Sequence, residues 1–178
     1  NALGGDTEAY ESIRYEGYGP GGVAILVEAL TDNRNRSGGA VRALFTKYGG
    51  NLGATGAVAH MFNHVGEILY TSAAGSPDAV FEAVIEAGGD DVQQDAGGYV
   101  VLCAFEQLGT VAHALEARLG EAASVKAVWK PNLTTQLDED KARTVLKLIA
   151  ALDEDDDVQN VYSNFEIDEA TMAKLTGG

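Results

Sequence analysis

A short polar segment, residues 32–37, carries the side chains of this sequence that are best suited to binding an anion. It contains Asn33, Arg34, Asn35 and Arg36, and it lies between an apolar run and a helical pattern. Forked guanidinium donors and amides suit phosphate groups and base edges, and a helix N-terminus also attracts anions. The same arginines could instead pair with nearby carboxylates in an ordinary solvated turn. The sequence leaves both interpretations open.

Three further residues extend this candidate surface along the helix predicted to follow. Arg42 and Lys47 add positive charge, and Asn51 adds an amide just beyond the end of that helix. No acidic residue lies between Arg34 and Lys47, so this segment is the one sizeable cationic region of the sequence. We therefore predict a nucleic-acid contact surface made of Asn33, Arg34, Asn35, Arg36, Arg42, Lys47 and Asn51.

The chain as a whole has the opposite charge. It contains 27 Asp and Glu against 12 Lys and Arg, which gives a formal net charge of −15 at pH 7. This charge repels a phosphate backbone at long range, so nucleic acid can bind only through a local basic patch. The alternative function is a protein-interaction module whose acidic surfaces, including residues 153–157, bind a basic partner. Salt titration distinguishes the two, because the contacts depend on different charges.

No pattern in the sequence is typical of a catalytic, cofactor or metal site. The glycine-rich residues 17–22 precede a strand, whereas phosphate-binding loops follow a strand and open a helix. Residues 153–157 begin with calcium-loop spacing but lack the later glycine and glutamate. His60 and His64 lie in a strand-and-turn segment with no acid or cysteine at ligand spacing. We predict a non-enzymatic protein with no metal, no cofactor and no small-molecule substrate.

Composition also bears on location. No apolar run approaches the roughly 18 residues that a membrane-spanning helix needs, and nothing resembles a signal peptide. The single cysteine, Cys103, excludes an internal disulfide and favours a reducing compartment. We therefore expect a cytoplasmic protein that does not bind membranes.

The elements that must position the candidate residues follow from hydrophobic spacing. Residues 23–30 are apolar except at Glu28, as expected for a strand covered on both sides. Ser37 is expected to cap a helix that ends at two glycines after Tyr48. Strands are then predicted at residues 57–62 and 67–71, which gives the order strand, helix, strand, strand.

The middle of the chain has its own regular order. From the strand at residues 67–71 it continues with a helix capped by Ser76, a hairpin over residues 91–105, a helix capped by Thr110 and a strand at residues 125–130. The resulting β-α-β-β-α-β order is the ferredoxin-like one.

The last elements have no sheet of their own to join. They are a helix capped by Asp138 and a strand at residues 159–167. The economical solution is that both return to the first strand and helix. We predict an α+β fold with two α/β-sandwich domains, in which a ferredoxin-like domain is inserted into a split β-α-β…α-β domain. The predicted boundaries are residues 15–65 with 131–178 for the split outer domain and 66–130 for the inserted domain.

Three motifs together closely resemble the YebC family. They are Tyr-Glu-Gly-Tyr-Gly-Pro-Gly-Gly-Val at residues 15–23, Thr-Asp-Asn-Arg-Asn-Arg at 31–36, and Lys-Tyr-Gly-Gly-Asn-Leu-Gly at 47–53, with Met-Phe following at 61–62. The resemblance covers the whole chain and is weakest in the middle. It implies three domains, of which the third is ferredoxin-like and inserted in the second. It also implies a basic helical domain missing from this sequence, with residues 1–14 as the linker from it.

The resemblance implies a role in gene expression. Bacterial members are described as transcriptional regulators, and a mitochondrial relative is a translational activator of cytochrome c oxidase. The resemblance implies one of two partners, DNA or the ribosome. On the ribosome such proteins relieve stalled synthesis. Either partner is expected to be bound mainly through the missing N-terminal domain. Relatives often carry an aromatic residue and a basic pair where this chain has His60 and His64-Val65, so that loop is not expected to add positive charge. We expect this chain alone to bind DNA poorly.

Overall fold

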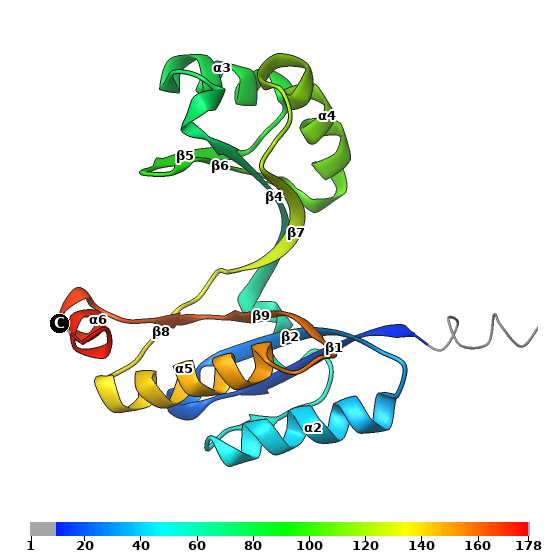
Figure 1. Ribbon diagram of the computed structural model, residues 1–178, viewed down its shortest axis with the longest axis vertical. Coiled ribbons are helices and arrows are strands. Elements are labelled where there is room, and N and C mark those ends of the chain that lie inside the picture. Colours follow the sequence, from blue (N-terminus) through cyan, green and yellow to red (C-terminus); the bar gives the residue numbers. More distant parts are fainter. Residues whose placement is uncertain (1–9, 178) are drawn as a thin grey trace, which may run out of the picture. The chain divides into compact units, whose positions relative to one another are not determined.

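The computed structural model describes residues 10–177, which form two compact units (Figure 1). One unit combines the chain up to Asn63 with the chain from Pro131 onward, and the other is His64–Lys130. Each unit contains a four-stranded sheet and helices, which confirms the α+β fold class predicted from the sequence. The first boundary lies two residues before the predicted one, since β4 (Phe62–Thr71) starts earlier than the sequence suggested.

The sheet of the first unit has the strand order β3-β1-β2-β9. β1 (Glu11–Tyr18) and β2 (Ala24–Thr31) form a hairpin in which Glu11 pairs with Thr31 and Tyr18 with Ala24. β3 (Asn51–Leu52) pairs with β1, and β9 (Val158–Ser163) pairs antiparallel with β2. β2 is therefore a central strand, and its first four residues are completely buried.

Two helices pack against this sheet. α2 (Arg34–Lys47) and α5 (Glu139–Asp153) share a core with one face of β2 (Figure 1). β2 contributes Ile25 and Val27, and Val23 just before it continues the alternation that a pleated strand must have. The helices contribute residues at three- and four-residue spacing, among them Val41, Phe45, Val145, Leu148 and Leu152. Burial of these side chains fixes α2 on the sheet and thereby places its outer side.

β1 is the main element that the sequence analysis missed. The predicted linker includes residues 11–14 and the predicted glycine-rich turn is residues 17–22, but Glu11–Tyr18 is a strand. The turn is shorter and closes the β1–β2 hairpin, with Gly21 and Gly22 at φ of 78° and 82°. Apolar and polar residues do alternate along β1, yet their partner strand lies on the far side of the glycines. The rest of the predicted linker, residues 1–9, lies outside the described residues.

The chain returns to the first unit after the second. β8 (Thr135–Gln136) and β10 (Phe165–Glu166) form a short parallel pair, and a helix that was not predicted, α6 (Glu169–Leu175), follows. The single strand predicted at residues 159–167 is thus divided into β9 and β10. The division falls at Asn164. Its side chain is fully buried and forms hydrogen bonds with the backbone of Ala24 and Leu133.

The second unit runs β4, α3 (Pro77–Ala87), β5 (Asp91–Asp95), β6 (Gly98–Ala104), α4 (Leu108–Leu119) and β7 (Ser124–Pro131). Its strand order is β5-β6-β4-β7. The second, third, first and fourth strands of the unit therefore lie side by side, which is the ferredoxin-like arrangement. α3 and α4 enclose a core with Ile68, Val101 and Leu115.

The structure confirms two of the predicted helix caps and contradicts a third cap and one strand. Ser76 and Asp138 cap α3 and α5 as predicted, each accepting a backbone N–H three residues on. Thr110 is not a cap, because α4 already begins at Leu108, after a 3-10 turn over Phe105–Gln107. The strand predicted at residues 57–62 is wrong and is replaced by a loop and a short 3-10 turn, Ala59–Met61.

No helix in the described part of the chain has the length and apolar character to cross a membrane.

Candidate nucleic-acid interface

The first candidate residues form the start of α2 and not a loop. Asn33 is the helix N-cap, and its Oδ1 accepts the backbone N–H of Arg36 at 2.9 Å. The predicted cap, Ser37, instead lies buried within the helix. Asn33 competes successfully because the hydroxyl of Thr31, at the end of β2, accepts its backbone N–H at 3.0 Å and holds it in place. Arg34 and its two successors therefore occupy the first turn of α2.

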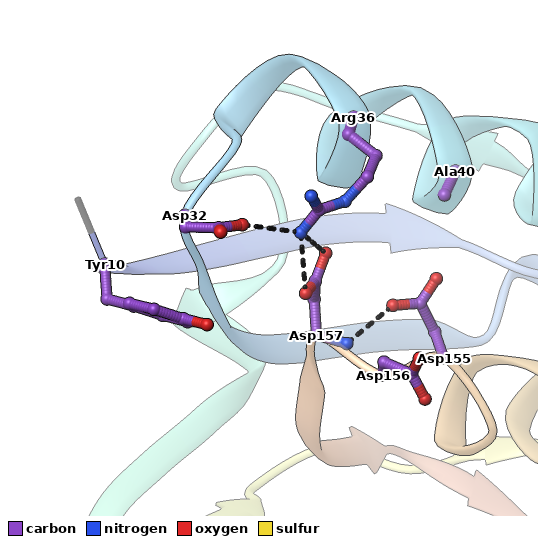
Figure 2. A pocket seen from close by; sticks show the side chains of 7 residues that line it. All are labelled: Tyr10, Asp32, Arg36, Ala40, Asp155, Asp156 and Asp157. Carbon is purple, nitrogen blue, oxygen red and sulfur yellow. Dashed lines mark hydrogen bonds and ion pairs between the residues drawn. The ribbon is translucent and has the colours of Figure 1, made fainter. Parts of the chain in front are cut away.

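Arg36 is bound to carboxylates. Its Nη2 lies 2.9 Å from Asp32 Oδ1 and 3.0 Å from both carboxylate oxygens of Asp157, in the turn before β9 (Figure 2). These hydrogen bonds, that with Asp157 foremost, raise the pKa of the Arg36 guanidinium. The alternative left open by the sequence, pairing with local acids, is thus the observed one for this arginine. Arg36 ties the start of α2 to the turn before β9.

A cavity of about 570 Å³ lies beside this arginine. Its lining consists of Tyr10, Asp32, Arg36, Ala40, Asp155, Asp156 and Asp157 (Figure 2). Four carboxylates against one guanidinium make the cavity unsuitable for a phosphate group and suitable for a cation. One carboxylate of this acidic turn, that of Asp157, is therefore paired with Arg36.

Arg34 is held only loosely. Its Nε and Nη2 each lie 3.3 Å from a carboxylate oxygen of Glu11, and the two side chains are 65% and 46% exposed. Pairs that are this exposed are screened by water and salt and contribute little. Glu11 therefore does little to hold the Arg34 side chain in place.

The remaining candidates lie along the outer side of α2 and beyond its end. Arg42 and Lys47 are exposed and make no ion pair within residues 10–177; the Lys47 ammonium lies 5.4 Å from the ring centroid of Tyr48. Asn35 is seven residues from Arg42, so both lie on one side of the helix. Asn51 is exposed on β3, next to the end of α2. The structure thus places these residues on one helix and its neighbouring strand, and Arg36 differs from them because it is paired with Asp32 and Asp157.

Glu16, on β1, is a residue whose role the sequence analysis did not identify. Its side chain is buried, and its carboxylate accepts the backbone N–H groups of Gly56, Val58 and Ala59 at 2.8–2.9 Å and the Arg14 guanidinium at 3.0 Å. Burial alone would raise the pKa of Glu16, but the loop N–H groups and Arg14 outweigh this effect and lower it. Glu16 thereby shapes the loop that follows β3 and Asn51. No local pattern indicates this role, since the three loop N–H donors lie some 40 residues from Glu16 in the sequence.

Gly39 stands in the middle of α2 with no steric need for glycine. An added Cβ there would meet no atom within 4 Å. Because glycine in a helix interior costs about 0.5–1 kcal/mol relative to alanine, Gly39→Ala should raise the free energy of unfolding by that amount in urea denaturation. Gly22 is the control, since it also has open space but has φ of 82°. Gly22→Ala should lower stability by about 1 kcal/mol, and a gain there as well would contradict the explanation.

The comparison with known proteins agrees with the motifs read from the sequence. The family model described as TACO1/YebC second and third domain matches residues 10–165. The crystal structure of a conserved hypothetical protein from Aquifex aeolicus is similar at a TM-score of 0.82 and 44% identity, over 90% of this chain and 67% of that chain. The family match covers most of the sequence and confirms the resemblance on which the domain expectation was based. This chain therefore belongs to the TACO1/YebC family.

Proposed function

We propose that this chain is part of a non-enzymatic regulator of gene expression and that it contacts nucleic acid, either DNA or ribosomal RNA, through the outer side of α2. The observation that carries the proposal is a contrast of charge. Residues 33–66 contain no Asp or Glu, and within them Arg42 and Lys47 are exposed and unpaired among the described residues, in a chain of net charge −15. Arg34 joins them once a phosphate displaces Glu11.

The residues of the surface have different roles in this proposal. Arg34, Arg42 and Lys47 bind phosphates, and the amides of Asn35 and Asn51 supply hydrogen bonds at either end of the helix. Asn33 and Arg36 act indirectly, because the first caps α2 and the second fastens it to Asp157. So small a set of cations gives weak binding, and we propose that the basic helical domain implied by the family resemblance supplies most of the affinity of the whole protein.

The test is a pair of charge-matched double variants of the full-length protein. Arg42→Ala with Lys47→Ala should weaken binding to duplex DNA or to ribosomal RNA about tenfold, and for DNA it should reduce the slope of log affinity against log salt by about two. The control is Arg143→Ala with Lys147→Ala on α5, which removes the same charges from exposed positions elsewhere. Equal losses in both double variants, or no loss in the first, would overturn the assigned surface.

The acidic cavity beside Arg36 supports a second candidate function, binding of a basic protein. Its carboxylates are Asp32, Asp155, Asp156 and Asp157, and only Arg36 among the lining residues is cationic. A basic side chain entering the cavity would gain charge contacts that a phosphate cannot. Asp155→Asn with Asp156→Asn should weaken such binding and leave nucleic-acid binding unchanged, whereas the α2 double variant should do the opposite.

A further inference from the structure

Three rings are stacked at one end of the sheet of the second unit. His64 lies between Phe105 and Trp129, with 4.2 Å between its ring centroid and each of theirs, and the planes are inclined by 22° and 5°. The sheet order β6-β4-β7 explains the stack. Val65 on β4 pairs with Ala104 on β6, so Phe105 emerges opposite His64, and β7 brings Trp129 to the other side. Each strand thus delivers one ring.

The stack ends in an exposed aromatic face. Phe105 is 42% exposed, whereas its partner His64 is partly buried. Phe105 begins the 3-10 turn Phe105–Gln107, and the next residue, Glu106, is exposed and has no ion pair among the residues that the structure describes. An exposed ring and a carboxylate without an ion pair among the described residues therefore occupy neighbouring positions on this turn, and the ring stacks on His64.

The charge of the second unit indicates what this turn can bind. Residues 64–130 contain ten acidic and three basic residues. Two of the three basic residues are already ion-paired, Arg118 with Glu86 and Lys130 with Glu67, which leaves Lys126. Such a surface repels the phosphates that accompany a nucleobase, and it attracts cations.

We propose that Phe105 and Glu106 form a binding site for an arginine side chain of a basic protein partner. A guanidinium is planar and cationic, so it stacks on an aromatic ring and at the same time donates to a carboxylate, which an ammonium group cannot do equally well. His64 stacks on the Phe105 ring and is itself backed by Trp129, so Phe105 loses less freedom when it binds. The site lies in the second unit and does not depend on the contact proposed for α2.

Binding at the stack can be followed by the fluorescence of Trp129, which is one of its three rings. Trp129 is the one tryptophan of the sequence, so its fluorescence can be followed without a label. The full chain would be titrated with a short peptide of alternating arginine and glycine, with the same peptide carrying lysine in place of arginine, and with a single-stranded oligonucleotide. The arginine peptide should change the fluorescence saturably and bind about three- to fivefold more tightly than the lysine peptide.

Substitutions of Phe105 and Glu106 test whether these two residues bind the arginine peptide. Phe105→Leu keeps an apolar side chain without a ring and should abolish the preference for arginine, and Glu106→Gln should weaken the arginine peptide about threefold. Ile85→Ala and Glu82→Gln, at exposed positions of the same unit, are the matched controls and should change nothing. Equal binding of both peptides, an unchanged preference in Phe105→Leu, or tighter Phe105-dependent binding of the oligonucleotide would each overturn the proposal.

Discussion

Replacing Glu16 with glutamine should lower the free energy of unfolding by about 2–4 kcal/mol. Both oxygens of the carboxylate accept hydrogen bonds, from Val58 and Ala59 on one and from Gly56 and Arg14 on the other. A glutamine side chain has only one acceptor oxygen. The donors to the other carboxylate oxygen would lose their acceptor and would face the NH₂ group of the amide instead. Urea denaturation measures the loss, and the amides of the loop should exchange with solvent faster.

The effect of this replacement should depend on pH. The pKa of Glu16 is lower in the folded chain than its usual value, so its contribution is fully present above the unfolded-state pKa of about 4.3. The contribution is lost as the pH falls through the folded-state pKa. The native chain should therefore lose stability on acidification more steeply than the glutamine variant, and the difference between them should shrink as the pH falls below about 4.3.

Glu11→Gln is the matched control, because Glu11 lies on the same strand but is 46% exposed and pairs only with exposed Arg34 among the described residues. Its replacement should change stability little. Equal effects of the two replacements would show that the buried network around Glu16 does not determine stability.

Replacing Asn164 with alanine should cost about 2–3 kcal/mol of stability. Its Oδ1 accepts the backbone N–H of Ala24 at 2.8 Å, and its Nδ2 donates to the carbonyl of Leu133 at 2.9 Å. Asn164 is completely buried, and Ala24 is too, so alanine would leave the Ala24 N–H without an acceptor inside the first unit. The side chain joins β2 to the segment by which the chain returns.

Asn160→Ala provides the comparison for Asn164→Ala. Asn160 lies on β9 only four positions earlier, is exposed, and donates to Glu28 at 3.1 Å. Its loss should cost less than about 0.5 kcal/mol. Thermal or urea unfolding of the two variants tests the explanation, which fails if the exposed asparagine proves as costly to remove as the buried one.

The sequence predicted what depends on local chemistry. The apolar run of β2 and the caps Ser76 and Asp138 were recognised correctly, because a run of buried residues and a capping side chain act within a few positions. The motifs around residues 15–62 also led to the family, and the α+β class followed from the order of the elements.

What remained unpredictable depends on residues distant in the sequence. β1 is defined by pairing across the glycine turn, and Glu16 receives its donors from a loop formed after β3. The pairing of Arg36 with Asp157 joins residues 121 positions apart, so a count of nearby charges could not reveal that this cation was already occupied. Asn33 caps α2 in place of the predicted Ser37, and its backbone N–H donates to the Thr31 hydroxyl at the end of β2.

The split of the first unit has a consequence for synthesis of the chain. β2 is a central strand, yet its neighbour β9 lies far downstream, as the Asn160–Glu28 contact over 132 positions shows. At translation rates of about 5–20 residues per second, the edge of β2 stays unpaired for on the order of ten seconds. All the strands that pair within the second sheet emerge in that interval. During synthesis, one edge of the apolar strand β2 must therefore be kept from other contacts until β9, which pairs with it, has been made.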